Sequence, residues 1–192
     1  MSSDNGLPRT ELDSHANSPV VGKHCMIIET LYRTVDVWGF TTSLGTFTVP
    51  VFNAALLYTC EYSGEKFIFL VYNALYVHDM EHNLIPPFVM RLAGLEIDEQ
   101  PKFLSHPPQL HNHSFYCPKI KHRFHLNLVG TVYYFPTNKP SDDDFQYIDK
   151  RVELTPPSPS WNPHDTSYEQ WEQNMITASG ELRVYPQNRH KE

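Results

Sequence analysis

The chain lacks paired cysteines, a long apolar run and an excess of positive charge, and each absence argues against a class of protein. Its three cysteines, Cys25, Cys60 and Cys117, are odd in number and irregularly spaced, which is typical of free thiols in a reducing compartment. No stretch approaches the roughly 18 apolar residues that a membrane-spanning helix needs. The net charge of −7 argues against a large phosphate-binding surface. We therefore expect a cytoplasmic protein with neither a membrane nor a nucleic acid as partner.

What the chain does contain favours strands. Hydrophobic residues make up 40% and charged residues 19%, as in globular proteins, and β-branched and aromatic residues are plentiful. Short apolar runs predict strands at 20–28, 33–37, 46–58, 66–72, 74–77 and 124–136. One helix is predicted at 88–93, after a cap at Asn83 and before a stop at Gly94.

Asp13 and Ser14 are the candidate catalytic residues. Aspartic proteases hold two carboxylates so close together that both cannot ionise, and one acts as acid while the other activates water. The chain offers one such aspartate, so activity requires a homodimer in which two Asp13 residues meet on a two-fold axis, braced by Ser14. Taken alone, an Asp-Ser pair is more often an ordinary turn or helix cap.

Three separated segments carry a family resemblance. Leu12-Asp13-Ser14-His15-Ala16 resembles the Leu-Asp-Ser-Gly-Ala protease motif of copia-type retrotransposon polyproteins. Residues 73–77, Asn-Ala-Leu-Tyr-Val, look like the Asn-Val-Leu-Tyr-Val segment of that family. Residues 82–85 and 90–94 are similar to the Asn-Leu-Leu-Ser helix that closes the same domain. Their order and spacing agree with the family over about residues 10–100.

The resemblance implies a mainly β fold, a small closed retropepsin-like β-barrel that ends in one short C-terminal helix. The aspartate turn would come first and a flap hairpin from Gly39 to Gly45 would follow. Ala16, Gly39, Phe40 and Gly45 would then contact a peptide of the parent polyprotein, and no cofactor is expected. The alternative for Gly39 and Gly45 is an ordinary hairpin with no role in substrate binding.

The same resemblance suggests an organisation in four parts. Residues 1–10 would be a flexible leader and 11–100 the retropepsin-like domain. Residues 101–136 would be a loop-rich extension with a few strands, and 137–192 an acidic, proline-rich linker or tail. By position alone, everything after residue 100 would correspond to the pre-integrase region of the family.

His15 departs from the family pattern, because it stands where the family has glycine. A side chain there costs about 1 kcal/mol if the turn needs a positive φ. A cationic imidazole beside Asp13 would also oppose the shared proton. The residues before Asp13 are more polar than those of a buried strand usually are. The alternative hypothesis is therefore a catalytically inactive, retroelement-derived domain that binds peptides or proteins.

A second candidate site lies in the C-terminal half, where five potential zinc ligands occur within fifteen residues: His111, His113, Cys117, His122 and His125. Their spacing matches no zinc knuckle, and a solvated loop is the alternative. Tyr133, Tyr134 and Phe135 are interpreted as core or interface aromatics. The acidic run 142–144 is interpreted as solvated linker rather than as a cation site.

Overall fold

A computed structural model describes residues 7–38, 45–158 and 162–183 of the chain. The chain divides into two compact units after residue 161. Across these ranges, no helix is long and apolar enough to cross a membrane.

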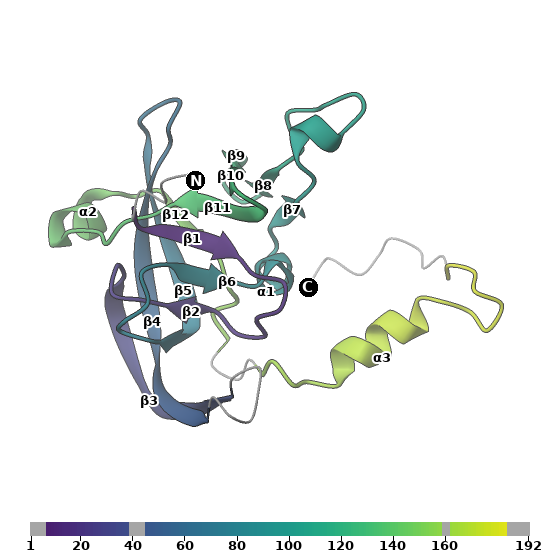
Figure 1. The fold of residues 1–192 in the computed structure, drawn as a ribbon, viewed down its shortest axis with the longest axis horizontal. Coiled ribbons are helices and arrows are strands. Elements are labelled where there is room, and N and C mark those ends of the chain that lie inside the picture. The colour runs from purple at the N-terminus through teal and green to yellow at the C-terminus, as the bar shows by residue number, and fades with distance from the viewer. Residues whose placement is uncertain (1–6, 39–44, 159–161, 184–192) are drawn as a thin grey trace. The chain divides into compact units, whose positions relative to one another are not determined.

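The first unit is built around a nine-stranded sheet (Figure 1). Its strand order is β10-β11-β1-β6-β2-β5-β4-β3, and β12 also pairs with β5. The strands are β1 (Arg9–Leu12), β2 (Val20–Val21), β3 (Met26–Trp38), β4 (Thr46–Thr59), β5 (Lys66–Tyr76), β6 (Asn83–Ile85), β10 (Asn127–Val129), β11 (Val132–Pro136) and β12 (Arg151–Glu153). A smaller sheet contains β7 (Glu96–Asp98), β8 (Ser114–Cys117) and β9 (His122–His125) in that order. The prediction of a mainly β fold is confirmed.

Short helical segments connect these strands. They are α1 (Pro87–Leu92), the 3-10 turn η2 (Lys102–Leu104) and α2 (Asp142–Tyr147) in the first unit, and α3 (Ser167–Asn174) in the second. The helix predicted at 88–93 corresponds to α1. Pro87 occupies its first turn, where the missing N–H breaks no helical hydrogen bond, and Gly94 follows its end with a φ of +86°.

The central strand β5 joins two segments that the sequence predicted as separate strands. Phe67 to Val71 are almost continuously buried, as in a strand covered on both faces. Asn73 then takes a φ of +56°, and the register with β4 shifts between Phe52 and Ala54. A β-bulge therefore absorbs the irregularity that divided the two predicted strands.

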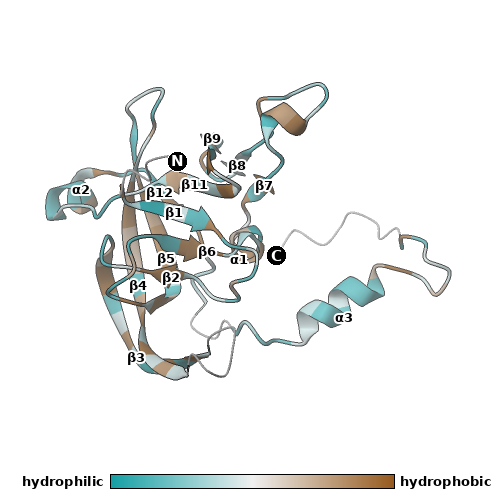
Figure 2. Cartoon of the chain, viewed as in Figure 1, coloured by the Kyte–Doolittle hydropathy of each residue, from teal (hydrophilic) through white to brown (hydrophobic). Residues whose placement is uncertain are grey.

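The core joins residues from both sides of the expected boundary near residue 100. Phe69 of β5 lies 5.1 Å from Phe124 and 5.7 Å from Phe135, measured between ring centroids. Phe115 stacks on Phe124 at 4.8 Å. All four rings are fully buried, and the hydrophobic colouring of β5 and β11 in Figure 2 follows the same core. The interpretation of Phe135 as a core aromatic agrees with this position.

The closed barrel predicted for the domain is wrong. Among the described strands, the two ends of the sheet are β10 and β3, which do not pair with each other. In a closed barrel, every strand has one face that points into the interior and is buried. Most side chains of β3 are exposed on both faces, so the strand has no interior face to present to a partner.

Residues 137–158, interpreted as linker, contain two ordered elements. Ser141 caps α2, with its hydroxyl accepting from the Asp144 N–H at 3.0 Å and the Asp144 carboxylate accepting from the Ser141 N–H at 3.1 Å. The acidic run 142–144 forms the first turn of this helix, where negative charge is favourable. Downstream, β12 pairs parallel to β5, with Val152 opposite Phe69.

The described part of the second unit, residues 162–183, contains α3 and a short bridged turn. Tyr168 and Trp171 lie on neighbouring turns of α3, with ring centroids 5.7 Å apart. Ile176 and Leu182 pair as an isolated antiparallel bridge. The helix α3 therefore lies within the range 137–192 that was interpreted as a linker or tail.

Candidate active site

The position of Asp13 is set by the strands on both sides of β1. On one edge, β1 pairs parallel to β6, with Leu12 opposite Ile85, and the Asp13 N–H donates to the Ile85 carbonyl at 3.2 Å. On the other edge, β1 pairs antiparallel to β11, with Glu11 opposite Tyr134. The backbone that leads into the turn is therefore fixed on both sides (Figure 1).

The turn after Asp13 is closed by the aspartate itself. The His15 N–H donates to Oδ1 of Asp13 at 2.9 Å, the hydrogen bond of an Asx-turn. Asp13 is half-buried, whereas Ser14 and His15 are exposed at the tip. The carboxylate is thus held by a backbone donor at the surface of a single chain, where a second molecule can approach it.

The predicted backbone cost of His15 does not arise. Within the described ranges, the non-glycine residues with a positive φ are Tyr32, Asn73, His113 and Lys121, and His15 is not among them. Because its φ is not positive, the imidazole-bearing residue fits the turn without left-handed strain.

A buried polar network lies beneath the turn. Asn83 accepts from the Gly22 N–H at 3.0 Å through Oδ1, and its amide donates to the Thr10 hydroxyl at 3.2 Å. The hydroxyls of Thr10 and Thr137 are 2.8 Å apart. Thr10, Asn83 and Thr137 are each at most 1% exposed. The polar side chain of Thr10 therefore suits a buried strand, because it has polar partners there.

This network was missed at the level of sequence. Asn83 was predicted to cap the helix, but the N-cap of α1 is Pro86, and no side chain caps it. The sequence pattern did not single out Gly22 as a position of close backbone contact either. A Cβ on Gly22 would lie 2.1 Å from the Met80 carbonyl oxygen, so this close approach excludes any side chain. No local pattern marks Thr137, whose role depends on contacts with residues far away in the chain.

The expected substrate-binding residues fall in two places. Ala16 is half-buried in the Asp13 turn. Gly45 has a φ of +72° and immediately precedes β4. The antiparallel pair of β3 and β4 ends with Trp38 opposite Thr46, so the predicted flap joins the two strands of a hairpin. Gly39 and Phe40 lie outside the described residues.

The five predicted zinc ligands are not brought together. Cys117 lies opposite His122 in the β8–β9 pair, but the His122 ring packs between Phe67 and Phe124, each 4.6 Å away between centroids. His113 and His125 contact two further aromatic rings, and His111 is exposed. In the ranges that the structure describes, no group of three or more His, Cys, Asp or Glu side chains could hold a metal ion. The geometry gives the zinc hypothesis no support.

Comparison of the chain with models of known protein families, with curated proteins and with solved structures gives no match.

Proposed function

We propose that the chain is a retropepsin-like aspartic endopeptidase of a retroelement polyprotein, active as a homodimer with one Asp13 from each copy. The observation that carries the proposal is the Asp13 turn: a single half-buried carboxylate at the end of a strand paired on both edges. Exposed Ser14 and His15 leave that turn open to a second copy.

The order of elements supports the proposal. The resemblance implies an aspartate turn first, a flap hairpin next and a short helix last. The chain has the turn after β1, the hairpin of β3 and β4, and then α1 directly after β6. The parallel pairing of β1 with β6 brings the end of the domain back beside the turn, which composition alone did not predict.

In the proposed dimer, the two Asp13 carboxylates hold one water and share one proton. The ionised carboxylate takes a proton from the water as its oxygen attacks the peptide carbonyl. The protonated carboxyl gives its proton to the carbonyl oxygen. When the tetrahedral intermediate collapses, the amine leaves with a proton from the dyad. The His15 N–H already occupies Oδ1, which leaves Oδ2 available to the water.

The test compares Asp13→Asn with Asp149→Asn, a matched change at an exposed aspartate in the loop before β12. Both proteins are incubated with a mixed peptide library at pH 4 to 6, and the products are identified by mass spectrometry. We expect Asp13→Asn to lose about a thousandfold or more of the cleavage rate, the usual order for removal of a catalytic group. Cleavage by Asp13→Asn at the rate of the control would contradict the proposal. So would a strictly monomeric protein by sedimentation that still cleaves peptides.

One observation favours the alternative, a non-catalytic peptide-binding module. The side chain of His15 is exposed at the tip of the turn, on the surface through which the second turn would approach. If the parent chain dimerises without cleaving any peptide and His15→Gly gains activity, the imidazole blocks the dyad and the alternative holds.

A further inference from the structure

A pocket of about 790 Å³ opens between the loop that follows β7 and the strands β9, β10 and β11, and none of its lining residues belongs to the Asp13 turn. Apolar side chains form its walls, among them Tyr62, Phe103, Leu110 and Leu128. Each of these four is well exposed in the single chain. In Figure 2 the helical turn of the projecting loop between β7 and β8 is hydrophobic, although it lies at the surface.

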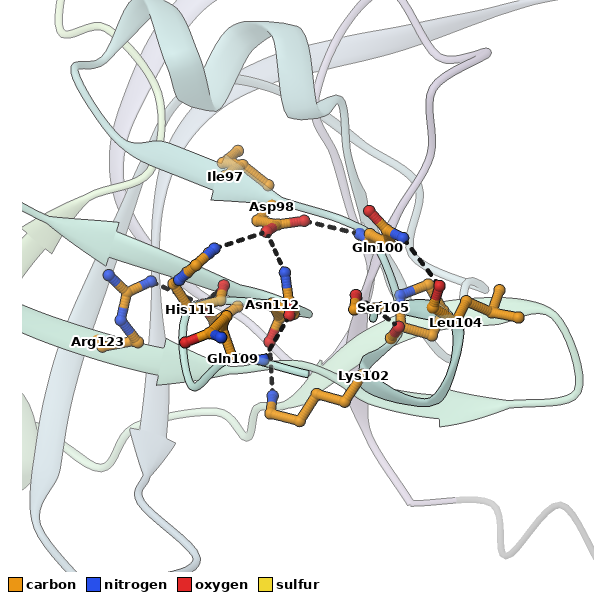
Figure 3. A network of polar contacts seen from close by, with 12 residues as sticks. Ile97, Asp98, Gln100, Lys102, Leu104, Ser105, Gln109, His111, Asn112 and Arg123 are labelled. Atoms are coloured by element: carbon orange, nitrogen blue, oxygen red, sulfur yellow. Dashed lines mark hydrogen bonds and ion pairs between the residues drawn. The ribbon is translucent and has the colours of Figure 1, made fainter. Parts of the chain in front are cut away.

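The polar groups of this pocket include three basic side chains, besides the Asn127 amide and the hydroxyls of Tyr62 and Tyr134. Lys102, His113 and His125 line it, and no carboxylate is among the described lining residues. The Asp98 carboxylate, in the strand before the loop, already has hydrogen-bond partners. Asp98 accepts from the Asn112 amide at 2.9 Å and from the Gln100 N–H at 3.0 Å, as Figure 3 shows.

Lys102 lies near both a carboxylate and a guanidinium. Burial lowers the pKa of Lys102, Asp98 raises it, and the nearby Arg123 lowers it. Burial also lowers the pKa of His125, together with Lys102, Arg123 and His122. Glu61 lies at the edge of the pocket, where it accepts from the amide of the lining Asn127 at 3.2 Å. An anion in the pocket would attract Lys102 and would favour the protonated form of His125.

His113 provides a second, independent observation. The residue is 7% exposed, and its Nε2 is buried without a hydrogen-bond partner. Its ring contacts Tyr133, at 5.1 Å between centroids, and a φ of +52° fixes its backbone in the left-handed region. A buried polar atom without a partner costs about 1–3 kcal/mol, so such atoms usually serve a ligand or an ordered water.

We propose that this pocket binds a carboxylate attached to an apolar body. The Lys102 ammonium and a ring N–H of His113 or His125 would donate to the carboxylate oxygens. The body would pack among Tyr62, Phe103, Leu110 and Leu128. Such a group is found in a free aromatic acid and at the C-terminal residue of a peptide, and the same side chains would recognise both.

The experiment uses two matched pairs of probes with the full chain. The first pair is 3-phenylpropionate and its amide, and the second is acetyl-Ala-Ala-Phe with a free or an amidated C-terminus. Affinity is measured by calorimetric titration, and the ring nitrogens are followed by NMR with ¹⁵N-labelled histidine. We expect at least one free acid to bind at least tenfold more tightly than its amide, and the Nε2 resonance of His113 to shift on binding. Binding of the small acid alone, or of the peptide alone, identifies the source of the carboxylate, and either result supports the site.

Variants separate the pocket from general charge effects. Lys102→Met should weaken binding of the acid at least tenfold, whereas Lys119→Met, a matched change at an exposed lysine, should leave it unchanged. Since Lys102 also donates to the Asn112 carbonyl, Leu128→Glu is the second variant, because Leu128 is partly exposed and can be replaced without disturbing the core. It should abolish the preference for acid over amide. Equal affinity for acids and amides, or no shift at His113 in the parent chain, would overturn the proposal.

Discussion

The first unit contains two polar loops that are held in place in different ways. The turn after β1 is anchored by backbone N–H groups, with the Asp13 N–H donating to the Ile85 carbonyl and the His15 N–H donating to Oδ1 of Asp13. The loop between β7 and β8 is anchored by side chains, with Asn112 linking Asp98 to the Gln109 N–H and Lys102 donating to the Asn112 carbonyl (Figure 3).

This difference suggests different uses. A catalytic carboxylate must be held rigidly, and backbone hydrogen bonds between paired strands provide that rigidity without depending on the exposed side chains at the tip. A loop held by a few polar side chains opens at a lower free energy and can adjust to a ligand. Changes of exposed side chains should therefore affect the first loop little, whereas one buried amide should control the second.

The largest effect on stability is expected beneath the Asp13 turn. Asn83→Ala removes the acceptor of the Gly22 N–H and the donor to the Thr10 hydroxyl, and it leaves a small cavity. We expect the free energy of unfolding to fall by about 2–4 kcal/mol in urea titrations. Asn17→Ala, at an exposed asparagine of the same turn, is the control. Equal losses in the two variants would show that the network does not support the turn.

A smaller and more local effect is expected in the second loop. Asn112→Ala removes the hydrogen bonds to Asp98 and from the Gln109 N–H, which should cost about 1–2 kcal/mol. Hydrogen exchange should accelerate across residues 99–113 while the amides of β1 and β6 keep their protection. Gln109→Ala, at an exposed amide in the same loop, should change neither. A uniform acceleration over the whole sheet would mean that the two loops are not held independently.

Acid should destabilise the region of the second loop first. Burial lowers the pKa of His113, and Lys102 lowers it further against the opposing charge of Asp98. Burial likewise lowers the pKa of His122 and His125. The unfolded chain then binds more protons, so this stability is complete above the unfolded pKa of about 6.5 and is lost as the pH falls through the folded values. Carboxylates with a lowered pKa, such as Asp98, lose their contribution only near pH 4 and below.

The measurement is the free energy of unfolding at pH 7.5 and pH 5.5, with His113→Gln and His111→Gln as the matched pair. His113→Gln should reduce the difference between the two pH values, and exposed His111→Gln should leave it unchanged. A difference that both variants share equally would remove His113 as its cause.

The smallest effect is expected at His15. Because this residue does not need a positive φ, His15→Gly relieves no strain and only increases the freedom of the unfolded chain. We expect a loss of about 0.5–1 kcal/mol in urea titrations. A gain in stability would show that the His15 side chain strains the turn. The exposed side chains at the tip would then matter to the first loop, contrary to the difference drawn between the two loops.

The local features of the fold were predictable from local patterns. The strands β4 and β5 and the helix α1 follow from apolar runs and from the Pro and Gly residues around α1, and the observed bounds lie close to those expected. Closure of the sheet was not predictable, because period and composition do not specify which edges meet. The outer strand β3 is exposed on both faces, and its pattern resembles that of any strand.

The candidate site was predictable only in part. Asp13 stands out because its motif is local and resembles a family. The side chains that support its turn do not stand out, since Thr10 and Thr137 are 127 residues apart and have no local signature. For the acidic run 142–144, the local pattern suggested the wrong structure. A charge cluster in a proline-rich context suggested a solvated linker, but Ser141 caps this segment and it forms the first turn of α2.

The pairing of β1 with β11 has a consequence for how the protein is made. Ribosomes synthesise a chain from its N-terminus to its C-terminus, so the strand that leads to Asp13 emerges well before its partner β11, which ends at Pro136. Until then one edge of β1 has unpaired backbone groups, and such edges readily pair with other chains. A nascent chain, or a fragment that stops near residue 100, would leave this edge open. Assembly of the aspartate turn is thus completed late in synthesis, by residues that lie far beyond the segment in which the motif is found.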